Sequence, residues 1–271
     1  TLLNEFSELA IEPYKAPKLE KMKTAQYVDK DTNPYAVVIS PTDFHYGKDA
    51  WEDETGETYN LETAQQRLME QTQNLIDRLP GRPEKIIIGT GSDWFHVDND
   101  MGTTTKGTPQ DTAGSPALIL RDGAYLARQH IEMLAKVAPV EVVFMRGNHD
   151  RHSSLALMIY LQAVYENSDR VTITDDLKLR QYTTYGNNLL GFTHGDGVRG
   201  ADLPALMSHE ARSEWGACEH HTWFHGHLHH IKQTEKAGCM VIQLPSLAGH
   251  DKWHYRKGFT LNRAGLMAHL V

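Results

Sequence analysis

The sequence predicts an α/β fold, in which a mixed β-sheet is layered with helices or two sheets pack together. Two observations lead to this prediction. In the first half of the chain, short apolar runs of strand length alternate with longer segments whose apolar residues recur at helical spacing. In the second half, short apolar runs dominate and one helical segment interrupts them. We expect an extension over residues 1–34, followed by a single domain over residues 35–271.

The apolar pattern assigns each element in turn. Strands are expected where short apolar runs end at glycine or polar residues, at 35–40, 84–91, 140–145, 170–174, 187–195, 221–226, 239–245 and 258–271. Helices are expected where apolar residues recur every three to four positions, at 61–79, 117–138, 153–167 and 201–215. Ser153 is a candidate cap for the third helix. The Gly- and Thr-rich loop 102–115 is long enough to suggest a lid or a control of substrate access.

Composition excludes several classes of protein. The formal net charge of −8 over 271 residues argues against extensive non-specific binding to the DNA backbone. No apolar run approaches the roughly 20 residues of a membrane span, and the N-terminal segment lacks signal-peptide features. Two cysteines do not make a disulfide framework. We therefore expect a cytoplasmic protein that does not bind membranes, whose oligomeric state the sequence leaves open.

Polar side chains follow the apolar runs at five places. Because active sites of open α/β sheets gather at the carboxyl ends of strands, these five segments are expected to converge. Imidazole, carboxylate and amide groups form a mixed nitrogen and oxygen set, which suits Zn²⁺, Mn²⁺ or Fe rather than Ca²⁺. Seven of the side chains at these places are candidate metal ligands, which is too many for one tetrahedral ion and suits two ions. The side chains concerned are Asp43, His45, Asp93, His96, Asn148, His149, Asp150, His194, Asp196, His225, His227 and His229.

The motifs "DFH", "SD", "GNHD", "THGD" and "GHLH" occur in the order typical of the calcineurin-like metallophosphoesterase superfamily, which the chain resembles over about residues 36–250. The resemblance implies two mixed β-sheets packed as a sandwich flanked by helices, with two divalent ions, Mn, Fe or Zn, of which Mn is favoured. It also implies roles for individual residues. Asp43, His45 and His229 would bind the first ion, Asp93 would bridge both ions, and Asn148, His194 and His227 would bind the second.

The same resemblance implies metal-assisted hydrolysis of a phosphoester. His149 would be the catalytic histidine, and Asp150 would orient it. Ser92 stands where the family more often has glycine before the bridging aspartate, so Asp98 is an alternative to Asp93. The stretch "SDWFH" is similar to the Mre11/SbcD-type nuclease branch, which would give His96 a catalytic role and make DNA a possible substrate.

Three functional hypotheses follow. The first is a nuclease-like phosphodiesterase acting on DNA, and the second is a small-molecule phosphodiesterase or phosphomonoesterase. The third is a metal-binding interaction module without catalysis. Ordinary structural roles are expected for the remaining polar groups near the motifs. These are Asp98 and Asp100 as solvated loop acids, His152 as a helix cap, His225 and His230 as structural residues, Asp196 as a candidate orienting group, and "KWHYRK" at 252–257 as a solvated loop.

Overall fold

A computed structural model describes residues 34–258, 261 and 263–271. The predicted N-terminal extension therefore lies, apart from residue 34, outside the described residues. Within the described part of the chain, no helix is long and apolar enough to cross a membrane.

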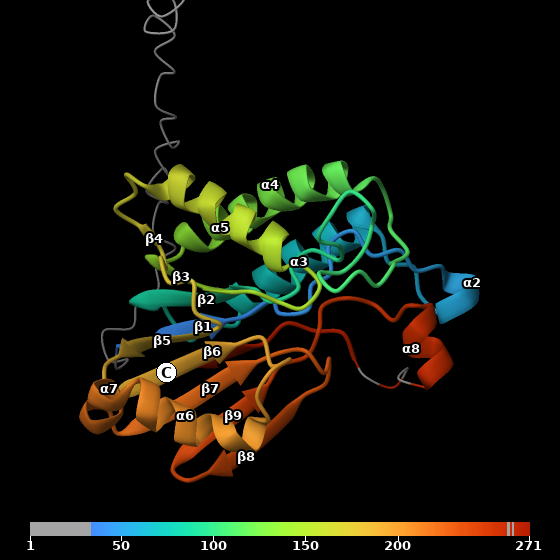
Figure 1. Ribbon diagram of the computed structural model, residues 1–271. Helices are drawn as coiled ribbons and strands as arrows, with labels where there is room; N and C mark the ends of the chain where they lie inside the picture. The colour runs from blue at the N-terminus through green and yellow to red at the C-terminus, as the bar shows by residue number, and fades with distance from the viewer. Residues whose placement is uncertain (1–33, 259–260, 262) are drawn as a thin grey trace, which may run out of the picture.

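Two mixed β-sheets form the centre of the molecule (Figure 1). In the first sheet, β1 (Ala36–Ile39), β2 (Lys85–Gly91), β3 (Val140–Met145) and β4 (Val171–Ile173) run parallel, and β10 (Ala268–Leu270) pairs antiparallel with β1. The second sheet has the order β5-β6-β7-β9-β8. Its strands are β5 (Arg180–Tyr185), β6 (Asn188–Thr193), β7 (His220–His225), β8 (Lys232–Lys236) and β9 (Cys239–Gln243). This architecture confirms the predicted two-sheet α/β fold.

Helices cover the outer faces of both sheets (Figure 1). The first sheet is covered by α3 (Leu61–Ile76), α4 (Pro116–Ala135) and α5 (Arg151–Tyr165). The second is covered by the 3₁₀ turn η1 (Gly200–Asp202), α6 (Leu203–Glu210) and α7 (Arg212–Ala217). Two short helices, α2 (Glu52–Thr55) and α8 (Lys252–Lys257), contact each other beside the sheets.

The alternation of side chains along each strand divides the core into layers. Val37 and Ile39 of β1 pack toward the helices α3, α4 and α5, whereas Ala36 and Val38 face the second sheet. Because β1 is buried on both faces, it is apolar at every position, as strands of covered parallel sheets are. The apolar layer between the sheets holds the carboxyl ends of β1, β2, β3, β6 and β7 at one edge of the sandwich.

Some elements differ from the prediction for identifiable reasons. The edge strand β8 is exposed at every position and carries the polar sequence KQTEK, so it has no apolar signal. The predicted helix 201–215 is divided at Ala211, and 252–257 is a helix rather than a solvated loop. In the tail, only Ala268–Leu270 forms a strand among the described residues.

His130 is a buried histidine of α4 with a fixed tautomer. The Thr72 hydroxyl donates to the Leu68 carbonyl at 2.7 Å, so it accepts from His130 Nε2 at 3.0 Å. Burial lowers the pKa of His130 from 6.5 to about 4. Its neutral form therefore stabilises the fold fully above pH 6.5, and this stabilisation is lost as the pH falls toward 4.

We expect His130→Leu to remove this acid sensitivity. Between pH 7 and pH 5 the wild-type protein should lose about 2 kcal/mol more of its unfolding free energy than the variant does. Urea unfolding at the two pH values measures the difference. His220→Leu, at an exposed position of β7, is the matched control and should retain the wild-type pH dependence. Parallel losses in wild type and His130→Leu would contradict the assignment.

Candidate metal centre

Five turns meet at the edge where the strand ends converge. The turns after β1 and β2 are joined by main-chain hydrogen bonds, from Asp43 N to Ser92 O at 2.8 Å and from His45 N to Asp93 O at 2.8 Å. The turns after β3 and β7 donate main-chain hydrogen bonds to the first two, from His149 N to Asp93 Oδ1 at 2.7 Å and from His227 N to Asp43 Oδ2 at 2.8 Å. The turn after β6 brings His194 Nε2 to 2.8 Å from Asn148 Oδ1. The tertiary structure therefore brings together side chains as far apart in sequence as Asp43 and His229, which are separated by 186 positions (229 − 43).

The first group of candidate ligands consists of Asp43, His45 and His229, whose ligand atoms all lie within 4.8 Å of one another. His45 Nε2 is 3.3 Å from His229 Nε2, and His229 Nε2 is 3.4 Å from Asp43 Oδ1. This is the set expected for the first ion, and it can hold one divalent cation.

The second group consists of Asp43, Asp93 and His194, again within 4.8 Å. His194 Nε2 lies 3.3 Å from Asp93 Oδ2 and 2.8 Å from Asn148 Oδ1. His227 is next to this group, with its ring centroid 5.0 Å from that of His194. Asp43 belongs to both groups and Asp93 to one, so the bridging role of Asp93 stays a prediction.

A third group joins the two histidines expected to take part in catalysis to the first ligand set. His45, His96 and His149 have ligand atoms within 4.8 Å of one another. His149 Nδ1 contacts the His96 carbonyl oxygen at 3.0 Å, and since a carbonyl only accepts, Nδ1 carries the proton. The rings of His45 and His149 have centroids 4.6 Å apart. His149 therefore lies beside the first group, and its Nδ1 is already hydrogen-bonded to the His96 carbonyl.

Asp150 and Asp98 differ from their predicted roles. Asp150 accepts a hydrogen bond from Phe95 N at 2.9 Å, and the His96 carbonyl, not Asp150, engages His149 Nδ1. Burial, with a contribution from Asp93, raises the pKa of Asp150 to about 7. Asp98 accepts from His152 N and Ser153 N at 2.9 and 2.8 Å, so it caps α5 and is neither a solvated acid nor the bridging ligand.

The other flanking groups have structural partners. His225 is buried and its Nδ1 contacts Gly226 O at 3.1 Å. The side chain of His230 is exposed, while its carbonyl accepts from Gln243. Asp196 pairs with Arg151 at 2.9 Å. The predicted structural roles of His225 and His230 agree with these contacts.

The backbone of the site is strained. Seven non-glycine residues in the described chain have positive φ, and the seventh, Ala237, is in the β8–β9 turn. The other six are Asp43, His45, Ser92, Asp93, His227 and His229. Left-handed backbone costs a non-glycine residue about 1–3 kcal/mol and persists where the surroundings enforce it, typically at functional sites. Five expected ligands therefore adopt a conformation that stability alone would not select.

Two motif glycines admit the carboxylates. A Cβ on Gly147 would lie 1.9 Å from Asp93 Oδ1, and one on Gly226 would lie 2.2 Å from Asp43 Oδ2. Gly147 of "GNHD" and Gly226 of "GHLH" must lack a side chain, because the carboxylate of another motif packs directly against each Cα. This explains in physical terms why glycine opens both motifs.

Burial and neighbouring charge tune the ligands. Burial, together with His149 and the other nearby histidines, holds the pKa of His45 well below 6.5, which keeps the imidazole in its neutral, metal-binding form. Burial opposes charge on both Asp93 and His194, but their mutual attraction outweighs it. The pKa of Asp93 is lowered and that of His194 is raised to about 9. A cation at this pair would take the place of the His194 proton.

The donor set fits divalent cations. Asp43 is fully buried, and its Oδ1 receives no hydrogen bond from the described residues. A buried carboxylate oxygen without a donor is costly unless a cation or proton meets it. The nearby imidazole nitrogens complete a mixed nitrogen and oxygen environment suited to Zn²⁺, Mn²⁺ or Fe. The residues present can therefore hold metal ions, whose identity the ligand chemistry leaves open.

The candidate ligands open onto a cleft of about 580 Å³. One wall is the loop 102–115, which contributes Thr104, Lys106 and Pro109 among others. Another wall is formed by α8 and the residues before it, with Asp251, Lys252 and His254 in the lining. Ser246 Oγ donates to the Asp43 carbonyl at 2.6 Å, which ties this wall to the first ligand turn.

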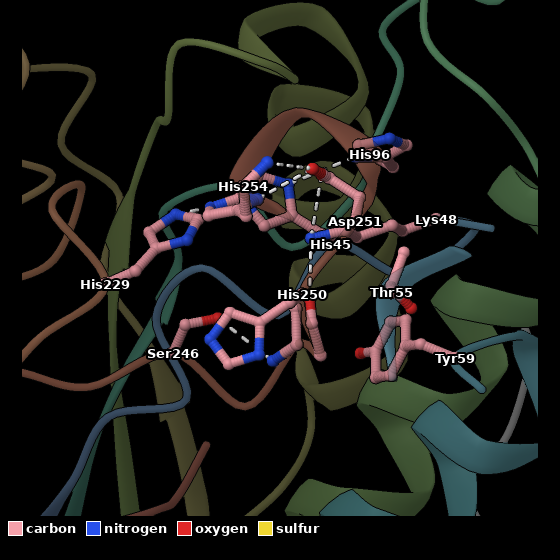
Figure 2. A network of polar contacts seen from close by, with 12 residues as sticks. His45, Lys48, Thr55, Tyr59, His96, His229, Ser246, His250, Asp251 and His254 are labelled. Atoms are coloured by element: carbon pink, nitrogen blue, oxygen red, sulfur yellow. Dashed lines mark hydrogen bonds and ion pairs between the residues drawn. The ribbon is translucent and has the colours of Figure 1, made fainter. Parts of the chain in front are cut away.

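A buried ion pair fixes the α8 wall (Figure 2). Lys48, with a side chain 1% exposed, donates to Gly249 O at 2.7 Å and pairs with Asp251 at 3.0 Å. Asp251 in turn caps α8 and contacts His254 Nδ1 at 2.7 Å, and the His254 ring stacks on His229. Burial lowers the pKa of Lys48, and Asp251 opposes that shift. Lys48 and Asp251 are not predicted as part of the site from the sequence, although Asp251 before a short run ended by Gly258 is a helix-capping pattern.

No family model matches the sequence, and no curated protein matches it. Solved structures show a similar arrangement at low identity. A phosphoesterase, YfcE, from E. coli is 14% identical with a TM-score of 0.44, covering 86% of this chain and 87% of that one. A conserved uncharacterized protein of Streptococcus pneumoniae, described as a predicted phosphoesterase, is 10% identical with a TM-score of 0.37, covering 89% and 85%. Vps29 from Entamoeba histolytica complexed with zinc is 13% identical with a TM-score of 0.35, covering 79% and 77%.

We expect Gly226→Ala to weaken cation binding at the first group. The added Cβ would displace the Asp43 carboxylate, so Mn²⁺ affinity should fall by about tenfold or more. Gly197→Ala, in the turn after β6, meets no atom within 4 Å and is the matched control. Isothermal titration of the metal-free protein with Mn²⁺ measures both. Equal affinities for the two variants would contradict the packing argument.

We also expect Lys48→Met to lower the unfolding free energy by about 3 kcal/mol, because it leaves the Asp251 carboxylate without its buried partner. The double variant Lys48→Met/Asp251→Asn should recover part of this loss, since the amide keeps the cap without the charge. Urea unfolding of the single and double variants gives the coupling. Strictly additive losses would show that the ion pair does not hold the wall.

Proposed function

We propose that the protein is a dinuclear metal-dependent phosphoester hydrolase. The observation that carries this proposal is the convergence of carboxylate, imidazole and amide ligands from five turns into two overlapping groups that share Asp43. His149, a residue with an engaged Nδ1, is beside them and lines the cleft. The order of the five motifs, which resembles that of calcineurin-like metallophosphoesterases, supports the same function.

Each part of the chain has a defined task in this proposal. Bound at these ligands, divalent cations supply the positive charge that neutralises phosphate oxygens and activates water. The glycine contacts and the strained turns hold Asp43 and Asp93 in place. The His96 carbonyl engages the Nδ1–H of His149, so Nε2 is free to take up a second proton, and this Nε2 proton is the one that passes to the leaving oxygen.

The cleft favours a small phosphoester over an extended DNA strand. Its volume of about 580 Å³ is in the range of small-molecule sites. Lys106 and Lys252 line it together with Asp49 and Asp111, so the lining carries both signs of charge. A groove for single-stranded nucleic acid would instead follow the backbone with positive charge. We therefore place small-molecule phosphodiesters and phosphomonoesters before DNA as substrates.

A substrate panel tests the proposal. Metal-free protein is reloaded with Mn²⁺, Zn²⁺ or Fe²⁺ and assayed with bis-p-nitrophenyl phosphate, p-nitrophenyl phosphate, cyclic nucleotides, and single- and double-stranded DNA. Turnover of a small ester that depends on added metal is the expected result. DNA degradation that falls steeply with salt would favour the nuclease-like alternative. No turnover with any metal and substrate would overturn the hydrolase proposal and leave a metal-binding interaction module.

His149→Ala should separate chemistry from metal binding. We expect kcat to fall about 10²- to 10⁴-fold because the proton donor to the leaving oxygen is lost. Metal content, measured by elemental analysis, should stay at the wild-type value because His149 belongs only to the third group, with His45 and His96, and to neither of the two groups that share Asp43. His152→Ala, three positions later and exposed, is the control and should keep its activity. A fully active, metal-loaded His149→Ala protein would refute the role.

A further inference from the structure

His96 contacts two other histidines of the candidate centre, His45 and His149. Its ring is buried, with 3% of the residue exposed, and its Nδ1 lies 3.3 Å from Nδ1 of His45. Its carbonyl oxygen engages His149 Nδ1 at 3.0 Å. Figure 2 shows His96 in the same cluster as His45 and His229. One residue therefore connects an expected metal ligand with the expected proton donor.

The hydrogen-bond chemistry of His45 gives the His96 ring a defined task. His45 Nε2 faces His229 Nε2 at 3.3 Å, so Nε2 is the nitrogen directed into the first ligand group. An imidazole that binds a cation through one nitrogen donates its other N–H to a neighbouring acceptor, which fixes its tautomer and orientation. For His45 that donor is Nδ1, and its hydrogen-bond partner in the described chain is His96 Nδ1. The His96 proton then resides on Nε2.

We infer that His96 is a positioning residue: its ring orients His45 toward the first cation and its carbonyl orients His149. This inference rests on the proposed function and differs from the nuclease-type role, in which the His96 ring would act on the substrate. The two roles use different atoms. To orient His45, His96 must accept a hydrogen bond at its Nδ1. To act on a substrate in the cleft, His96 must instead use the far side of its ring, which carries Nε2.

Two amide substitutions distinguish these roles. The side-chain amide of Asn reaches the place of a histidine Nδ1, and that of Gln reaches the place of Nε2. His96→Asn should keep Mn²⁺ affinity at the first group within about threefold. His96→Gln and His96→Ala should lose about 10- to 100-fold, as expected when the partner of a metal-ligating histidine is removed. Isothermal titration of the metal-free full-length chain with Mn²⁺ measures the affinities, and His152→Asn is the control.

Each outcome decides the inference. A higher Mn²⁺ affinity in His96→Asn than in His96→Gln and His96→Ala supports the positioning role. This result would hold even if the wild-type protein hydrolysed none of the substrates, an outcome that would overturn only the proposed function. Wild-type Mn²⁺ affinity in all three variants would overturn the positioning role. The same conclusion would follow if His96→Gln kept its turnover of substrate and His96→Asn lost it. Failure of the wild-type chain to bind Mn²⁺, Zn²⁺ or Fe²⁺ would overturn both proposals. Unfolding midpoints of the metal-free variants identify any variant that fails to fold, and His96→Asn against His96→Gln remains the deciding pair.

Discussion

The packing of two buried carboxylates against two glycines constrains the whole site. Asp43 and Asp93 are 0% and 1% exposed, and each occupies space that a Cβ on Gly226 or Gly147 would fill. Burying two carboxylates this close together is unfavourable unless positive charge meets them. In the described chain His194 and His229 approach these carboxylates, and a divalent cation would meet them more strongly. The chemistry of the site follows from this need for positive charge.

The fold provides the rigidity that such a site needs. Apolar layers on both faces of the first sheet hold β1, β2 and β3 in register, so their carboxyl ends stop at one edge. The second sheet presents the ends of β6 and β7 to the same edge. Left-handed backbone at five expected ligands costs free energy, and the surrounding core is what keeps those turns in place.

Residues 246–257 form one wall of the cleft and also contact the first ligand turn. Ser246 bonds the Asp43 carbonyl, and the Lys48–Asp251 pair secures α8 against the turn after β1. His254 thereby stands against His229 at the cleft. A buried ion pair is weak evidence for stability, but this one joins the turn after β1 directly to the residue that caps α8. The cleft wall is therefore coupled to the first ligand turn.

Apolar periodicity predicts the α/β class and most of the elements, and strand-end chemistry predicts the convergence of five motifs, because both signals are local. The choice of two packed sheets came from the resemblance of the motifs, since the apolar pattern left a single layered sheet open. The sequence could not determine partners set by distant contacts. Asp98 caps α5, the His96 carbonyl replaces Asp150 beside His149, and Asp43 is shared by two ligand groups. The polar strand β8 has no apolar signal, and the buried Lys48 resembles any surface lysine in sequence. These points become visible in the folded chain alone, because each depends on which residues of distant turns fill the same buried space.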